Sequence, residues 1–168
     1  IKEEEVVVLI SKLGYIKRVP LTQYKAQSRG GKGSLSATLI EGDYINQIFT
    51  ATTKSYITFF TNEGKVYWIK VHEIPEASRS SRGSSIKSLI QLNPDEEIST
   101  IVTMSDYRDD EYIFMATANG IVKKCVTTEF ANAKTRGVIG IKLRDGDKLV
   151  SAIMTSGKDD LMLITRRG

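Results

Sequence analysis

Short runs of β-forming residues recur along the chain in pairs, and each pair is joined by a turn that ends in glycine. Four segments share this pattern, and their turn glycines are Gly14, Gly64, Gly120 and Gly168. Asn119-Gly120 is the strongest of these signals, because both residues tolerate the positive φ angles that a tight hairpin requires. The pattern therefore predicts β-hairpins around Gly14, Gly64 and Gly120, and the start of a fourth that stops at its turn glycine, Gly168.

The hairpins belong to a longer repeat. Their glycines are spaced by 50, 56 and 48 residues, and a period near 50 is typical of blade-type β repeats. Each of the first three hairpins is followed by a polar loop with an Arg-Gly pair, then by an acidic turn and a further strand. The arginines are Arg29, Arg82 and Arg136, and the further strands are expected to begin at Ile45, Ile98 and Leu149.

Because helical periodicity is almost absent, the repeats predict an all-β fold. We expect a β-pinwheel or propeller-like array of four-stranded antiparallel blades, with about three blades present in a ring that is open or incomplete. The predicted units, all parts of one domain, are blade 1 at 1–54, blade 2 at 55–110, blade 3 at 111–158 and the start of blade 4 at 159–168.

Composition argues against several kinds of chemistry. The 168 residues include one histidine, His72, and one cysteine, Cys125, too few for a structural zinc site. Cys125 falls in the apolar register of the repeat, so we expect it to pack in the core. No run approaches the ~18 apolar residues of a membrane helix. The chain begins at Ile1 without a signal-like segment, and we expect an internal piece of a longer cytosolic protein.

The net charge is only +4, but the basic residues gather at particular repeat positions. Between residues 6 and 40 there is no acidic residue, and the loops and second hairpin strands are basic. This distribution predicts a basic rim that suits a polyanion, although basic residues on exposed strands also discourage edge pairing. The candidate rim contacts are Lys17, Arg18, Arg79, Arg82, Lys123, Lys124, Lys134 and Arg136.

The loop after the first hairpin contains three glycines among seven residues, from Gln27 to Gly33. Such a backbone can approach a phosphate closely. Arg29 adds a planar fork for phosphate oxygens and Lys32 adds a compact charge. A flexible turn explains the same residues if they are considered alone.

This heptapeptide resembles the gyrase A-box, Gln-basic-Arg-Gly-Gly-basic-Gly, of the DNA gyrase A protein within the type IIA topoisomerase family. Six of the seven positions match, and Ser28 replaces the usual basic residue; the box residues are Gln27, Ser28, Arg29, Gly30, Gly31, Lys32 and Gly33. The repeats resemble the same family's C-terminal β-pinwheel over essentially the whole chain, as the N-terminal half of that domain. The box favours gyrase over the related topoisomerase IV, whose corresponding loop is eroded.

The resemblance implies that the domain binds, bends and wraps duplex DNA without sequence preference, and so enables ATP-dependent negative supercoiling. It implies no catalytic residue, metal or cofactor in this fragment, and ATP and Mg in the holoenzyme. The implied partners are the gyrase A cleavage domain and gyrase B, in a bacterial cytoplasm and associated with the nucleoid, with no membrane. The alternatives are the equivalent topoisomerase IV domain and a propeller-type module that binds protein or RNA.

Overall fold

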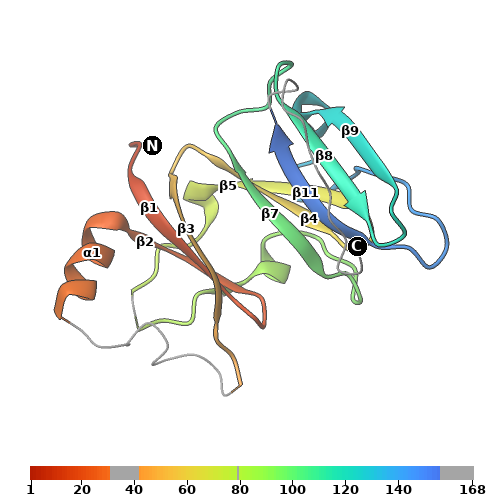
Figure 1. The fold of residues 1–168 in the computed structure, drawn as a ribbon. Helices are drawn as coiled ribbons and strands as arrows, with labels where there is room; N and C mark the ends of the chain where they lie inside the picture. Colours follow the sequence, from red (N-terminus) through yellow and green to blue (C-terminus); the bar gives the residue numbers. More distant parts are fainter. Residues whose placement is uncertain (31–41, 79, 156–168) are drawn as a thin grey trace.

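The computed structural model describes residues 1–30, 42–78 and 80–155. Three antiparallel sheets follow one another along the chain, with the N-terminal sheet at one end and the third sheet at the other (Figure 1). None of the helices in these ranges is long and apolar enough to cross a membrane. Within the described ranges, the fold is all-β apart from one α-helix and three short 3-10 helices.

Each sheet is built on a hairpin that the turn glycines predicted. The hairpin strands are β1 (Glu5–Ser11) with β2 (Tyr15–Pro20), β4 (Tyr56–Thr61) with β5 (Lys65–Lys70), and β8 (Tyr112–Thr117) with β9 (Val122–Val126). Gly14, Gly64 and Gly120 have φ angles of 91°, 78° and 87°, a conformation that glycine adopts without strain. These three hairpins are confirmed, and the fourth, at Gly168, lies outside the described residues.

The third strand of each sheet begins at the residue that the repeat predicted. These strands are β3 (Ile45–Thr52), β7 (Ile98–Met104) and β11 (Leu149–Thr155). Each pairs antiparallel with the first strand of its own hairpin, as β3 does with β1. The local pattern therefore accounts for three strands of every sheet.

The fourth strand of a sheet comes from the following repeat, which the sequence did not predict. Strand β6 (Ser84–Ser85) pairs with β2 of the first sheet, and β10 (Val138–Ile139) pairs with β5 of the second. The strand orders are β3-β1-β2-β6, β10-β5-β4-β7 and, in the described part of the third sheet, β11-β8-β9. Consecutive repeats are therefore joined by strand exchange as well as by the chain itself.

A helix, α1 (Leu21–Gly30), replaces the polar loop expected after the first hairpin. It forms because Leu21 and Tyr24, one helical turn apart, pack against a small apolar cluster on the first sheet. The second and third repeats place short 3-10 helices at this position, and a further one follows β6. These are η2 (Val71–Glu73), η4 (Thr127–Phe130) and η3 (Ile86–Ser88).

The core lies between the sheets. Phe59 packs toward the first sheet with Val8 and Ile16, whereas its neighbour Phe60 packs toward the third sheet with Ile113. Neighbouring residues of a strand point to opposite faces, so the middle sheet is buried on both sides. Among the methionines that the structure describes, Met104 and Met115 pack in the core, whereas Met154 is exposed.

Carboxylates from the acidic turns hold the hairpin ends. Glu96 accepts hydrogen bonds from the Thr61 hydroxyl at 2.6 Å and from the Tyr67 hydroxyl at 2.8 Å. At the corresponding place in the other sheets, Asp43 accepts from the backbone N–H of Leu13, and Asp147 accepts from that of Asn119. The acidic residues thus stabilise the ends of the hairpins as well as turning the chain.

The segment that carries Gly137 and β10 comes from the third repeat and packs on the second sheet. Two glycines with similar φ angles allow a test of how tightly it is packed. A Cβ added at Gly137 would lie 2.5 Å from the buried Tyr67 ring, whereas Gly120 has open space. We expect Gly120→Ala to lower the free energy of unfolding by about 1–2 kcal/mol through its φ angle alone. Gly137→Ala is expected to lower it by about 1–3 kcal/mol more, because the Tyr67 ring must move. Chemical denaturation measures both, and equal losses would contradict this packing.

Candidate nucleic-acid interface

The three sheets have an inner and an outer edge. Strands β7 and β11 lie side by side at the inner edge, where each is the terminal strand of its sheet (Figure 1). The opposite terminal strands are β6, β10 and, in the described part of the third sheet, β9. We call the latter set the outer edge.

Exposed cations gather along the outer edge. Arg82 precedes β6 by two residues, and Arg136 precedes β10 by the same distance; neither side chain is buried. Lys134 is exposed in the same loop as Arg136, and β9 carries Lys123 and Lys124. The structure thus brings five of the eight predicted rim residues to one edge of the three sheets.

Several of these cations are held at the outer edge by neighbouring groups. The guanidinium of Arg82 lies 4.8 Å from the centre of the Tyr15 ring, and the ammonium of Lys124 lies 4.5 Å from that of Tyr112. Lys123 donates a hydrogen bond to the Gly140 carbonyl at 3.0 Å. Cation–π contacts of this kind orient a charge while leaving it accessible to an anion.

Lys17 was predicted to lie on the basic rim, but the structure buries it. Its side chain is 2% exposed, and its ammonium donates to the carbonyls of Ser81 at 2.8 Å and Ser78 at 3.5 Å. Desolvation lowers the pKa of Lys17 from its ordinary value of 10.5. The expectation that Lys17 lies on an exposed rim is wrong, because its ammonium is directed into the protein.

Arg18 also differs from the prediction. Its side chain is 15% exposed, its Nε donates to the Ile74 carbonyl at 2.6 Å, and its guanidinium lies 3.7 Å from the Glu76 carboxylate. The adjacent pair Lys17 and Arg18 therefore holds the segment that runs from η2 toward β6. In this structure both residues link two repeats.

The aromatic pair at the corresponding place in the second repeat is also structural. Tyr67 is fully buried, and burial together with its hydrogen bond to Glu96 raises its pKa. Trp68 donates its ring N–H to the Phe130 carbonyl at 3.0 Å and packs edge-on against Tyr56. Trp68 therefore packs within the protein.

The glycine-rich heptapeptide is only partly described. Gln27, Ser28, Arg29 and Gly30 form the end of α1, so the expected loop is wrong for the backbone of these four residues. Gly31, Lys32 and Gly33 lie outside the described residues, as does the rim candidate Arg79. Contact between the heptapeptide and a phosphate therefore stays a prediction.

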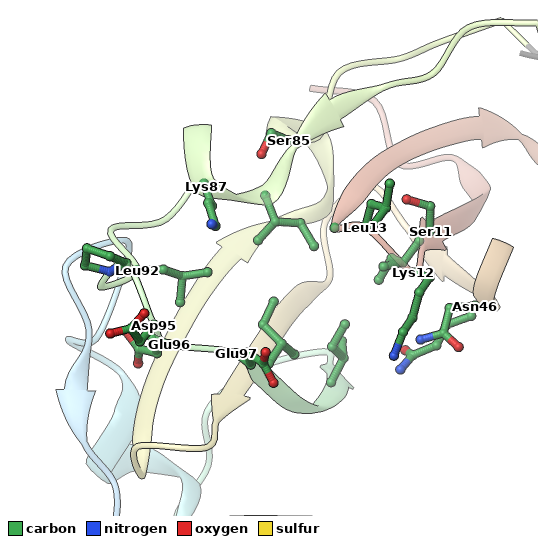
Figure 2. A pocket seen from close by; sticks show the side chains of 17 residues that line it. Ser11, Lys12, Leu13, Asn46, Ser85, Lys87, Leu92, Asp95, Glu96 and Glu97 are labelled. Carbon is green, nitrogen blue, oxygen red and sulfur yellow. The ribbon is translucent and has the colours of Figure 1, made fainter. Parts of the chain in front are cut away.

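A cleft of about 510 Å³ separates the first hairpin from the segment that follows β6. In Figure 2, Lys12 and Asn46 lie on one side, and Lys87, Asp95 and Glu97 lie on the other. The turn glycines of the first two sheets differ here, because Ile141 lies directly against Gly64, whereas a Cβ at Gly14 would meet nothing within 4 Å. The cleft beside the first hairpin is lined by both lysines and carboxylates, so its charge differs from that of the basic outer edge.

The single cysteine and the single histidine of the chain lie in different repeats. Cys125 is 5% exposed in the core, as the repeat register predicted, and His72 is half-buried in η2. Burial, with a smaller contribution from Glu129, raises the pKa of Cys125 to about 11. In the described ranges, no group of three or more His, Cys, Asp or Glu side chains could hold a metal ion.

Consecutive sheets that exchange a strand and share a basic outer edge define a propeller-type repeat domain with a surface suited to a polyanion. The family model described as "DNA gyrase C-terminal domain, beta-propeller" matches residues 5–52, 55–103 and 111–156. The chain belongs to this family. Both the expected resemblance and the expected fold class are confirmed.

Relatives agree with this family. The DNA gyrase A protein of Treponema pallidum is 55% identical over the whole chain, which covers 21% of that protein. The DNA gyrase A protein of Escherichia coli K12 is 45% identical, also over the whole chain, which covers 19% of it. The chain therefore spans about a fifth of the length of these relatives.

Solved structures agree as well. A DNA gyrase A C-terminal domain matches with a TM-score of 0.71 and 37% identity, over 91% of this chain and 48% of that one. The C-terminal domain of a DNA topoisomerase IV matches with a TM-score of 0.77 and 28% identity, over 94% of this chain and 47% of that one. Sequence identity is thus higher to the gyrase domain, although the topoisomerase IV backbone superimposes slightly better.

The raised pKa of Cys125 predicts an unreactive thiol. With a pKa of about 11, only about one thiol in 1,000 is ionised at pH 8, and the thiolate is the reactive form. We expect a coloured disulfide reagent to label native protein at least about 100-fold more slowly than protein in denaturant, where the usual pKa near 8.5 returns. Equal rates in the two conditions would show that Cys125 is not in the core.

Proposed function

We propose that this chain binds, bends and wraps duplex DNA as the C-terminal domain of a DNA gyrase A protein. The observation that carries the proposal is the outer edge, where Arg82, Arg136, Lys134, Lys123 and Lys124 lie on three successive sheets. Arginine and lysine on a surface contact phosphates, which fix the position of a duplex without reading its sequence. Binding is therefore expected to be insensitive to base sequence.

The number of cations matters because bending DNA is unfavourable. Smoothly bending 20–30 base pairs by 40–90° costs about 1–6 kcal/mol. A single exposed contact does not offset that energy, but several contacts spread over consecutive sheets can do so. Since Arg82 and Arg136 each sit beside an exchanged strand, they are spaced by the sheets themselves.

In the complete protein, we propose that wrapping presents a DNA segment for ATP-dependent strand passage, so that negative supercoils are introduced. The proposed partners are the cleavage domain of the same polypeptide and gyrase B, in an A2B2 enzyme that binds ATP and Mg outside this chain. The relatives named as DNA gyrase A proteins support this assignment, and so does the higher identity to the gyrase domain. We place the enzyme in the bacterial cytoplasm, with the nucleoid.

The first test counts phosphate contacts. If the five exposed cations of the outer edge engage DNA, log affinity falls with log salt with a slope of about −4 to −5. We expect Arg82→Ala and Arg136→Ala each to reduce that slope by about 0.9, because each removes one phosphate contact. Fluorescence anisotropy of a labelled duplex at several salt concentrations measures the slopes.

Two controls accompany the salt series. Lys12→Met removes one positive charge from the cleft, away from the outer edge, and is expected to leave the slope unchanged. Structured RNA added as a competitor is expected to displace duplex DNA poorly. An affinity independent of salt would contradict wrapping, and preferential binding of the RNA would favour an RNA-binding module.

The second test concerns the heptapeptide. Replacing Gln27–Gly33 with alanines is expected to abolish supercoiling by the reconstituted enzyme, because the glycines and both basic side chains are lost together. Relaxation of supercoiled DNA is expected to survive, since this chain contributes no catalytic residue. Agarose gel assays of plasmid topology measure both activities. Loss of relaxation as well would point to a folding defect, and retained supercoiling would contradict the role of the heptapeptide.

A further inference from the structure

The segment that carries Arg82 belongs to the second repeat but is attached to the first sheet. Strand β6 pairs with β2, and the Ile86 N–H donates to the Gly14 carbonyl at 2.8 Å. The Arg82 guanidinium itself lies over Tyr15, a β2 residue. The position of this cation on the outer edge is therefore set by the first hairpin.

Lys17 fixes the turn directly before Arg82. Its buried ammonium donates to the carbonyls of Ser81 and Ser78, and the Ser81 N–H closes the same turn on the Ser78 carbonyl at 3.0 Å. A buried ammonium requires acceptors, and backbone carbonyls at defined positions satisfy it. The ammonium therefore holds both ends of the turn in place.

The backbone that follows Arg82 approaches β2 closely. Gly83 has a φ angle of 89°, and a Cβ at this position would lie 2.5 Å from the Ile16 carbonyl oxygen and 3.0 Å from the Lys17 Cβ. The backbone after Arg82 therefore lies directly on the strand. A shift of the turn changes where the guanidinium points.

The second repeat has the same arrangement with a different side chain. Tyr67 occupies the same place as Lys17, three residues after the turn glycine. Its ring lies 2.5 Å from where a Cβ at Gly137 would be, directly after Arg136. In both described cases, this strand position supports the Arg-Gly pair of the following repeat.

We infer that Lys17 is a positioning residue for the DNA contact of Arg82, and that it does not contact DNA itself. The inference rests on the proposed function, since it assumes that the outer edge binds DNA. The turn at Ser78 and Ser81 transmits the effect. Lys17 and Arg82 consequently act as one unit in DNA wrapping.

A double-mutant cycle in the complete enzyme tests this inference. Nicked circular DNA is ligated at increasing enzyme concentration without ATP, and the constrained linking difference gives the concentration for half-maximal wrapping. We expect Lys17→Met and Arg82→Ala each to raise that concentration about three- to tenfold, and the double variant no further than the more affected single variant. Lys12→Met, which removes the same charge from the same hairpin, is expected to stay within about twofold of the unchanged protein.

Local hydrogen exchange separates loss of positioning from unfolding. Lys17→Met is expected to speed amide exchange in residues 78–86 while the hairpin strands keep their protection. If exchange rises throughout the domain, Gly83→Ala serves as the second variant, because it displaces the loop and keeps the Lys17 charge. It is expected to reduce wrapping by the same factor, again without adding to Arg82→Ala.

Three results would overturn the inference, and a fourth would overturn the proposed function. Additive losses for Lys17→Met and Arg82→Ala, or wrapping by Lys17→Met equal to that of the unchanged protein, overturn the inference. So does an Arg82→Ala variant that wraps normally while Lys17→Met does not, because the effect then bypasses Arg82. If the unchanged protein constrains no linking difference, the proposed function itself fails.

Discussion

Two residues from each following repeat complete the sheet before it, and the arrangement of the exposed cations depends on this pairing. Ser84–Ser85 joins β2 and Val138–Ile139 joins β5. The Arg-Gly pairs directly precede these short strands, so the backbone hydrogen bonds that close a sheet also set the place of a guanidinium. The places of Arg82 and Arg136 on the basic outer edge are a geometric result of strand exchange.

The interior makes this edge stiff. The middle sheet packs on both neighbours, with Phe59 on one face and Phe60 on the other, and neither ring is exposed. Interiors packed in this way resist deformation. When a duplex follows such a surface, the DNA rather than the protein changes shape, and contacts that are positioned beforehand require little ordering of side chains.

Features that depend on neighbouring residues were predicted correctly, whereas contacts between residues far apart in the sequence were missed. Turn glycines and alternating strands identified the hairpins and the first residues of β3, β7 and β11, because these features depend on neighbouring residues. Strands of two residues have no periodicity, and their partners lie in another repeat. The outward direction of Lys17 was wrong for a related reason, since the Ser78 and Ser81 carbonyls that bury it are more than 60 residues away. Helix α1 was missed because its apolar face is short: in the part whose side chains are described, Leu21 and Tyr24 pack on the sheet.

Strand exchange also constrains how domains of this type change in length. A segment cut at the limits of one sequence repeat, such as 55–103, takes β6 away from the first sheet and lacks β10, the strand that completes its own sheet. Recombination that removes or duplicates such a segment preserves the fold only if every strand equivalent to β6 (Ser84–Ser85) can still pair with a strand equivalent to β2. Gene duplication is thereby limited to crossovers at equivalent points of two repeats, which keep each donor strand in phase with the sheet that receives it.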